Sequence, residues 1–474
     1  MVFSSAAFMF AFLPITLILY FLPFSKDESK EIGKRNLVLC LVSLVFYAWG
    51  EPVHIFLMLL SIFFNYLIGM DIQKHRDEEK NPKAIFIFAL VFNLFMLGFF
   101  KYSGFFVSNI NSLFGTSIEY NAPPLPVGIS FYTFQILSYV IDVYKGELKA
   151  QKNIIYFACY VTMFPQLIAG PIVQYSDIEK QLSERKVTSD GFVYGIRMFI
   201  KGLSKKVLFA NTIGAVYTEI MGLGDIRELS VVTAWIAVIC YTLQIYFDFS
   251  GYSDMAIGLG KMFGFDFVQN FNFPYKADSI KDFWRRWHIS LSTWFRDYVY
   301  IPLGGNRVGP KRQIFNILVV WCLTGLWHGA NWTYMAWGLY FGILLIIEKL
   351  YLKKHLEKLP AVLQHIYVLF FVLVSFVLFN AETFTMAKDD LAFMFGLTGA
   401  PLISDDTLYN LSSYAVLLIV AFIGATPVAK NLFRKTENNR LIQVAEVAVT
   451  AAVLIMSTAY LVDGSFNPFL YFRF

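Results

Sequence analysis

Long apolar runs without charge, separated by short charged segments, dominate the chain. The main runs cover residues 36–50, 53–70, 84–107, 125–144, 231–247, 361–380, 410–429 and 441–462. Because a helix rises about 1.5 Å per residue and a bilayer core is about 30 Å thick, runs of about 20 apolar residues are typical of transmembrane helices. The pattern predicts an all-α polytopic membrane protein with about ten spans plus broken or re-entrant pieces.

The charged segments between these runs predict how the chain is oriented. Lys and Arg gather in residues 26–35, 71–83, 145–152, 349–358 and 430–440. The positive-inside rule places such loops in the cytoplasm. Loop 108–124 contains no Lys or Arg, and loop 381–409 is acidic, so both are predicted to be external. The N-terminus and the C-terminus are then both predicted to be extracytoplasmic. Since no basic segment precedes the first apolar run, we do not expect a signal peptide.

The middle of the chain is less regular. Residues 153–173 are apolar but are interrupted by Pro165 and Pro171, and residues 190–219 mix apolar residues with Lys and Arg. The second pattern is typical of an interfacial or re-entrant helix. Irregular backbone at membrane depth is tolerated only inside protein or beside a water-filled cavity. We therefore expect a cavity near the centre of the chain.

Composition supports a membrane protein and excludes a large soluble domain. Of 474 residues, 57% are hydrophobic and 15% are charged, against about 25% charged residues in soluble domains. No polar stretch is long enough to form a soluble domain, so residues 1–474 are predicted to form one membrane domain with an external aromatic tail at 463–474. The four cysteines lack metal-type spacing. We expect membrane lipids around the protein, and neither a metal nor a nucleic-acid partner.

His328 is the most informative ionisable residue. It lies in a turn between two uncharged apolar arms, 313–327 and 332–347. Each arm of about 16 residues reaches only about 24 Å as a helix, so the turn is predicted to stop inside the membrane. An ionisable side chain there is costly and indicates a functional site. A neutral imidazole suits a general base, although a helix–helix hydrogen bond is the alternative role. Asn331 is a nearby polar group that could support His328.

Residues 276–312 are the most polar stretch in the core half of the chain, and residues 283–298 within it alternate aromatic and cationic side chains and include the second ionisable candidate, His288. The cationic and aromatic candidates are Arg285, Arg286, Arg296 and Trp287. The stretch could be an interfacial helix anchored on anionic lipid. It could also bind a phosphate-bearing acyl donor, since Arg pairs bidentately with phosphate.

Two further polar features lie in apolar surroundings. Asp248 and Asp254 could orient a His or an Arg, but we favour structural pairing, for example with Arg285 and Arg286. The aromatic tail from Phe466 to Phe474 could form an aromatic belt at the outer interface. It could also enter a cavity, with the Tyr471 hydroxyl as a nucleophile.

These motifs together resemble the membrane-bound O-acyltransferase family, in its bacterial branch that O-acetylates alginate, peptidoglycan or cellulose. The matching segments are Met1 to Ser5 with Phe12-Leu13-Pro14, Pro126 to Phe131, Asp248 to Asp254, Arg285-Arg286-Trp287-His288, Arg296 to Gly305, Trp327-His328-Gly329 and the tail. The resemblance implies a ring of helices around a central tunnel. It also implies that His328 is the catalytic histidine, that His288 is a second catalytic position, and that Tyr471 is an acyl relay. Trp327, beside His328, would be a supporting residue.

The resemblance implies a membrane O-acetyltransferase of the bacterial cytoplasmic membrane. Acetyl-CoA is the expected donor, and a secreted or membrane-anchored SGNH-type acetyltransferase or esterase is the expected partner, with a polysaccharide as the final acceptor. Two alternatives stay open. One is a D-alanyl transferase for teichoic acid, and the other is a transporter without chemistry of its own.

Overall fold

The computed structural model describes residues 2–23, 27–168, 170–222, 229–436, 439–463, 467–468 and 470. These residues form helices and no strand, which confirms the all-α prediction. Within the described ranges, seven helices are long and apolar enough to cross a membrane: His54–Asp77, Lys83–Phe114, Val231–Met262, Trp332–Leu356, Ala361–Asn380, Asp405–Gly424 and Arg440–Val462. The sequence predicted about ten spans. The difference arises because other predicted spans form shorter or more polar helices.

The described residues group into two compact units that interleave along the chain. The first unit comprises Met1–Phe199, Ser253–Gln269 and Arg296–Tyr298, and the second comprises Ile200–Tyr252, Asn270–Phe295 and Val299–Phe474. The boundary falls inside two continuous helices, α9 (Ser189–Ser204) and α11 (Val231–Met262). A single membrane domain over 1–474 stays a prediction.

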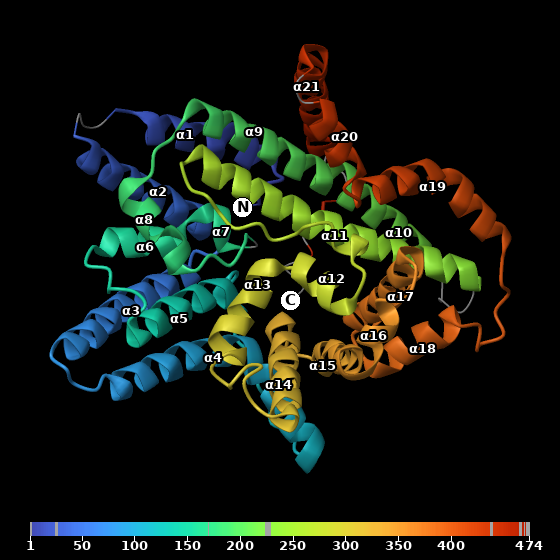
Figure 1. The fold of residues 1–474 in the computed structure, drawn as a ribbon, viewed down its shortest axis with the longest axis horizontal. Helices are drawn as coiled ribbons and strands as arrows, with labels where there is room; N and C mark the ends of the chain where they lie inside the picture. Colours follow the sequence, from blue (N-terminus) through green and yellow to red (C-terminus); the bar gives the residue numbers. More distant parts are fainter. Residues whose placement is uncertain are drawn as a thin grey trace. The chain divides into compact units, whose positions relative to one another are not determined.

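The first unit contains the N-terminal helices. They are η1 (Phe8–Phe12), α1 (Leu13–Phe21), α2 (Glu28–Ala48), α3 (His54–Asp77), α4 (Lys83–Phe114), α5 (Ile129–Lys145), α6 (Ile154–Thr162), α7 (Phe164–Leu167) and α8 (Tyr175–Glu184). Helices α3, α4 and α5 pack side by side (Figure 1). The predicted break in 153–173 is confirmed, because α6 ends at Thr162 and the short α7 contains Pro165.

A buried arginine ties several parts of this unit together. Arg185 follows α8 and is 7% exposed. Its guanidinium donates to the Tyr20 hydroxyl at 3.2 Å, to the Phe263 carbonyl at 3.1 Å and to Asn36 Oδ1 at 2.6 Å. Buried charges persist only where such hydrogen bonds replace water, so Arg185 fixes α1, α2 and the segment after α11 around itself.

The second unit contains the remaining helices. They are η2 (Lys205–Asn211), α10 (Thr212–Gly222), η4 (Pro274–Lys276), α12 (Ile280–Arg286), α13 (Ile289–Phe295), α14 (Pro310–His328), α15 (Trp332–Ile347), η6 (Glu348–Leu352), α16 (Lys353–Leu356), α17 (Ala361–Asn380), α18 (Phe384–Met394), α19 (Asp405–Gly424), α20 (Val428–Thr436) and α21 (Arg440–Val462). The π-helical η5 (Arg296–Tyr300) has residues in both units. Predicted spans 361–380 and 441–462 match α17 and α21 closely.

Helices α14 and α15 form the predicted hairpin (Figure 1). Two glycines allow them to cross closely. A Cβ at Gly325 would clash with the Tyr334 carbonyl and lie 2.9 Å from Met335 Cα. A Cβ at Gly338 would clash with the Trp321 carbonyl and lie 3.0 Å from the Gly325 nitrogen. The backbones therefore touch, and only glycine fits at this crossing.

The arms of the hairpin are longer than the sequence predicted. Helix α14 begins at Pro310 and has 19 residues, because Lys311 and Arg312 belong to its first turn. The second arm continues through the π-turn η6 to Leu356, giving 25 residues. At 1.5 Å per residue these arms span about 28 Å and about 37 Å. The prediction that each arm is too short to cross was wrong for the second arm, which is a candidate membrane span, whereas α14 remains slightly shorter than a bilayer core of about 30 Å. Arm length alone therefore does not place the turn at mid-membrane.

The glycine crossing yields a stability prediction. Gly338→Ala is expected to destabilise the folded protein by about 1–3 kcal/mol, the usual cost of overpacking. The measurement is the thermal unfolding midpoint of the purified protein in detergent. Gly98→Ala in α4 is the matched control, since a Cβ there meets no atom within 4 Å. The control should keep or raise the midpoint, because Ala favours helix over Gly by about 1 kcal/mol. Equal midpoints for both variants would contradict the close crossing.

Candidate active site

His328 is the last residue of α14 and lies in an aromatic enclosure. The side chain is 6% exposed. Three rings surround it edge-on, with centroid distances of 5.0 Å to Trp327, 5.0 Å to Trp337 and 5.4 Å to Phe379. After His328 the chain becomes extended at Gly329, and the Asn331 side chain caps α15 by accepting from the Thr333 backbone N–H. The end of one helix and the start of the next thus fix the imidazole.

His288 lies at the joint between α12 and α13. It is 1% exposed and has a φ of +43°, a left-handed conformation that costs energy for a non-glycine residue. Asn270 holds this joint in three ways. Its carbonyl accepts from the Ile289 N–H at 2.9 Å, and its side-chain oxygen accepts from the Ser290 N–H at 3.1 Å and from the Ser290 hydroxyl at 2.9 Å. Such strain, held by buried hydrogen bonds, is typical of functional sites.

The His288 ring is buried without a polar partner. Neither ring nitrogen makes a hydrogen bond to any residue that the structure describes. Burial lowers the pKa of His288 to about 3, because removing water penalises the imidazolium. The ring is therefore neutral at physiological pH, with one nitrogen able to donate a hydrogen bond and the other able to accept one.

Trp327 connects the two histidines. The centroid of its ring system lies 5.8 Å from that of His288 and 5.0 Å from that of His328, in edge-on geometry with both. A single indole therefore contacts both imidazoles within the second unit. The sequence predicted His288 and His328 in one site, and the structure places both imidazoles against the same side chain.

The cationic candidates are placed differently from one another. Arg285 is exposed on α12, whereas Arg286 pairs with Asp282 one helical turn earlier, at 2.7 Å. Arg296 is exposed, belongs to the first unit, and pairs with its neighbour Asp297 at 2.7 Å. Trp287 is 3% exposed and packs against rings that include Phe283 and Phe376. Its surroundings are those of a core residue.

The two carboxylates in the apolar stretch 248–254 belong to α11. Asp248 forms an ion pair with Lys206, at 2.7 Å between Oδ1 and Nζ, and both side chains are 1% exposed. Structural pairing was the favoured interpretation, but the partner is Lys206 and not the arginines of α12. Asp254 is 9% exposed and belongs to the first unit.

The tail is described at three positions. Leu470 is 5% exposed, and its N–H donates to Asp248 Oδ2 at 3.1 Å. The Pro468 carbonyl accepts from Lys206, and Asn467 Oδ1 accepts from Asn211 at 3.1 Å. Tyr471 lies outside the described residues, so its predicted role stays a prediction.

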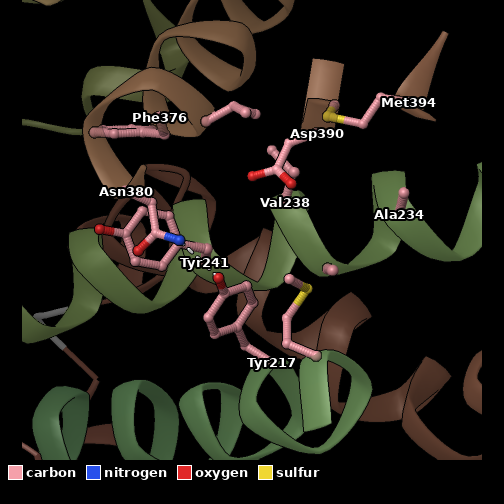
Figure 2. A pocket seen from close by; sticks show the side chains of 11 residues that line it. Tyr217, Ala234, Val238, Tyr241, Phe376, Asn380, Asp390 and Met394 are labelled. Atoms are coloured by element: carbon pink, nitrogen blue, oxygen red, sulfur yellow. Dashed lines mark hydrogen bonds between the residues drawn. The ribbon is translucent and has the colours of Figure 1, made fainter. Parts of the chain in front are cut away.

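A pocket lies between α10, α11, α17 and α18 (Figure 2). It is lined mainly by apolar side chains, with Asp390 directed into it and a hydrogen bond of 2.8 Å from Asn380 to the Tyr217 hydroxyl. Helix α17 contributes side chains both to the surroundings of His328 and to the pocket. Phe379 contacts His328, whereas Phe376 and Asn380 line the pocket.

Sequence reasoning missed Asn270, Trp337 and Phe379. Asn270 follows an apolar segment in a loop rich in Asn and Phe, a composition that signals a loop without naming its partner. Glu348 was also missed. It is 5% exposed and accepts from the backbone N–H groups of Ile280 and Lys281, at 2.8 Å and 3.0 Å. A lone glutamate in an apolar helix was the available signal, and its role is to hold the start of α12.

A model of the MBOAT family, the membrane-bound O-acyltransferases, matches residues 39–387. The chain is 37% identical to a protein named probable alginate O-acetylase from Azotobacter vinelandii, over all of both chains. It is 33% identical to the peptidoglycan O-acetyltransferase of Helicobacter pylori, covering 100% of this chain and 98% of that one. Similarity to the teichoic acid D-alanyltransferase of Bacillus subtilis is 28% identity, covering 54% of this chain and 69% of that one.

The pocket carboxyl yields a pH prediction. Burial, and secondarily Asp389, raises the pKa of Asp390 to about 6. Since this pKa exceeds the unfolded value of 3.8, the contribution of Asp390 to stability is complete below about pH 4 and is lost as pH rises through 6. Asp390→Asn is therefore expected to stabilise the protein at pH 8 and to have little effect at pH 4. Because Asp390 is only partly buried, solvent screening reduces the expected gain at pH 8 to about 1 kcal/mol. Thermal unfolding at both values measures this, with exposed Glu119→Gln as control. A gain at pH 4 but not at pH 8 would refute the sign.

Proposed function

Since the chain belongs to the membrane-bound O-acyltransferase family, we propose that this multi-pass membrane enzyme transfers acetyl groups outward across the membrane. A thioester on the cytoplasmic side, acetyl-CoA, is the proposed donor. An extracytoplasmic partner, a secreted or membrane-anchored SGNH-type acetyltransferase, receives the group and O-acetylates a cell-surface or secreted polysaccharide. The names of the full-length relatives support acetyl as the transferred group and a polysaccharide such as alginate or peptidoglycan as the final acceptor.

The paired histidines carry this proposal. His328 is the proposed general base. It takes the proton of an acceptor hydroxyl as the oxygen attacks the thioester carbonyl, the C–O bond forms and the C–S bond breaks. The proton then passes to the departing thiolate, so the imidazole returns to its neutral form. His288, kept neutral by burial and held by Asn270, would orient a reacting oxygen by hydrogen bonding.

The donor end is proposed to lie near α12. Arg285 is exposed there, and a guanidinium binds phosphate bidentately. Arg286 would contribute through the guanidinium N–H groups that do not bind Asp282. Arg296 belongs to the first unit, and its role in donor binding stays a prediction from the sequence. The tail is proposed to carry the acyl group out of the protein, with Tyr471 as the acyl relay and its ester as the intermediate.

A second candidate is a D-alanyl transferase for teichoic acid. The relatives with that name match about half of this chain, whereas the O-acetylating relatives from Azotobacter vinelandii and Helicobacter pylori match all of it, so acetyl transfer is favoured. Membership of an acyltransferase family removes the transporter alternative. Incubating the purified protein with labelled acetyl-CoA or with labelled D-alanyl carrier protein separates the two donors.

The central test replaces the proposed base. His328→Ala is expected to lower polysaccharide O-acetylation in cells by at least about 100-fold, the usual contribution of general-base catalysis. The measurement is acetate released from cell-surface polysaccharide by mild alkali, normalised to the amount of membrane protein. His355→Ala, an exposed histidine in α16, is the matched control and should acetylate normally. Normal acetylation by His328→Ala at normal protein levels would refute the mechanism.

The acyl relay has its own test. Mass spectrometry of the tail peptide after incubation with acetyl-CoA is expected to find an acetyl ester on Tyr471, and Tyr471→Phe is expected to lose it. Tyr460→Phe in α21 controls for the loss of a tyrosine near the tail. An intact acetyl signal in Tyr471→Phe would assign the relay to another residue.

A further inference from the structure

The ion pair between Lys206 and Asp248 lies in an unusual setting. Lys206 belongs to the π-helical η2 and Asp248 to α11, one of the candidate membrane spans. Both side chains are 1% exposed. A buried pair is expensive unless further hydrogen bonds satisfy its remaining donors and acceptors. The groups that supply those hydrogen bonds therefore indicate the role of the Lys206–Asp248 pair.

The backbone of the tail supplies them. Asp248 uses Oδ1 for Lys206 and Oδ2 for the Leu470 N–H, at 3.1 Å. Lys206 donates in turn to the Pro468 carbonyl. The anion thus meets a backbone donor and the cation meets a backbone acceptor, two residues apart on the same segment. Asn211, also in η2, adds a hydrogen bond of 3.1 Å to the Asn467 side chain.

We propose that Lys206 and Asp248 form a backbone clamp that fixes the register of the tail. The clamp binds peptide groups, so it specifies where the segment lies and in which direction it runs. Tyr471, the proposed acyl relay, follows Leu470 directly in the sequence. Lys206 and Asp248 are therefore positioning residues for the tail. Their effect on acyl transfer rests on the proposed relay, whereas the docking of the tail does not.

The polarity of the clamp distinguishes it from an ordinary ion pair. Exchanging the two residues, Lys206→Asp with Asp248→Lys, keeps an anion opposite a cation and so keeps the attraction between η2 and α11. The exchange would turn the ammonium toward the Leu470 N–H and the carboxylate toward the Pro468 carbonyl. Donor would face donor and acceptor would face acceptor, so the exchanged pair could join the helices but could not hold the tail.

Hydrogen exchange of the full-length protein in detergent, without any donor, tests the clamp. Asp248→Asn is expected to speed exchange of the Leu470 amide, read in a peptide covering residues 463–474, by at least tenfold. The exchanged double variant is expected to show the same fast exchange while recovering the protein yield and thermal midpoint lost in the single variant. Asp266→Asn is the matched control, since it removes a carboxylate from the pair with Lys261 in the other unit.

Two outcomes would overturn the clamp. One is wild-type exchange at Leu470 in Asp248→Asn, and the other is wild-type exchange in the double variant. If the double variant does not fold, Lys206→Met provides a second variant, and slow exchange there would also count against the clamp. The Tyr471 ester is measured separately with donor present. A protected tail without an ester would refute the relay and leave the clamp intact.

Discussion

The close crossing of α14 and α15 is the constraint on which the candidate site depends. Because Gly325 and Gly338 bring the two backbones into contact, the turn between them is short and the side chains at its ends are held from both sides. His328 ends one helix, and Trp337, one helical turn and a half into the other, closes over it. A larger residue at either glycine would separate the helices and open the aromatic enclosure.

The chemistry of the site follows from what surrounds the imidazoles. Aromatic rings pack against both His288 and His328. Burial keeps the His288 imidazole neutral, and a charge that develops in such surroundings is weakly screened. Excluding water also protects a thioester or an ester intermediate from hydrolysis. The joint at His288, strained and held by Asn270, supplies the fixed geometry that such chemistry requires.

The sequence predicted those features that depend on local pattern. Charged residues bracket the apolar runs, so α17, α21 and the α14–α15 hairpin could be located within a few residues. Helix α11 was predicted to end near residue 247 but continues to Met262, because the charge of Asp248 is neutralised by Lys206 from a distant segment. The contact of both histidines with Trp327 could not be predicted, since it depends on how α12, α13 and α14 pack. The same holds for Asn270, whose partners Ile289 and Ser290 follow η4 and α12 in the chain.

The π-helical stretch η2 lies in a helical segment whose lysines face both the surface and the interior of the protein. Helices α9 and α10 continue through η2 without a break, and a π-turn holds one more residue than an α-turn. One extra residue rotates everything after it by about 100° around the helix axis. Lys201 before the stretch is exposed, whereas Lys206 within it is buried. The locally underwound turn thus shifts the register between α9 and α10, so that one continuous helical segment carries an exposed cation before the stretch and a buried cation within it.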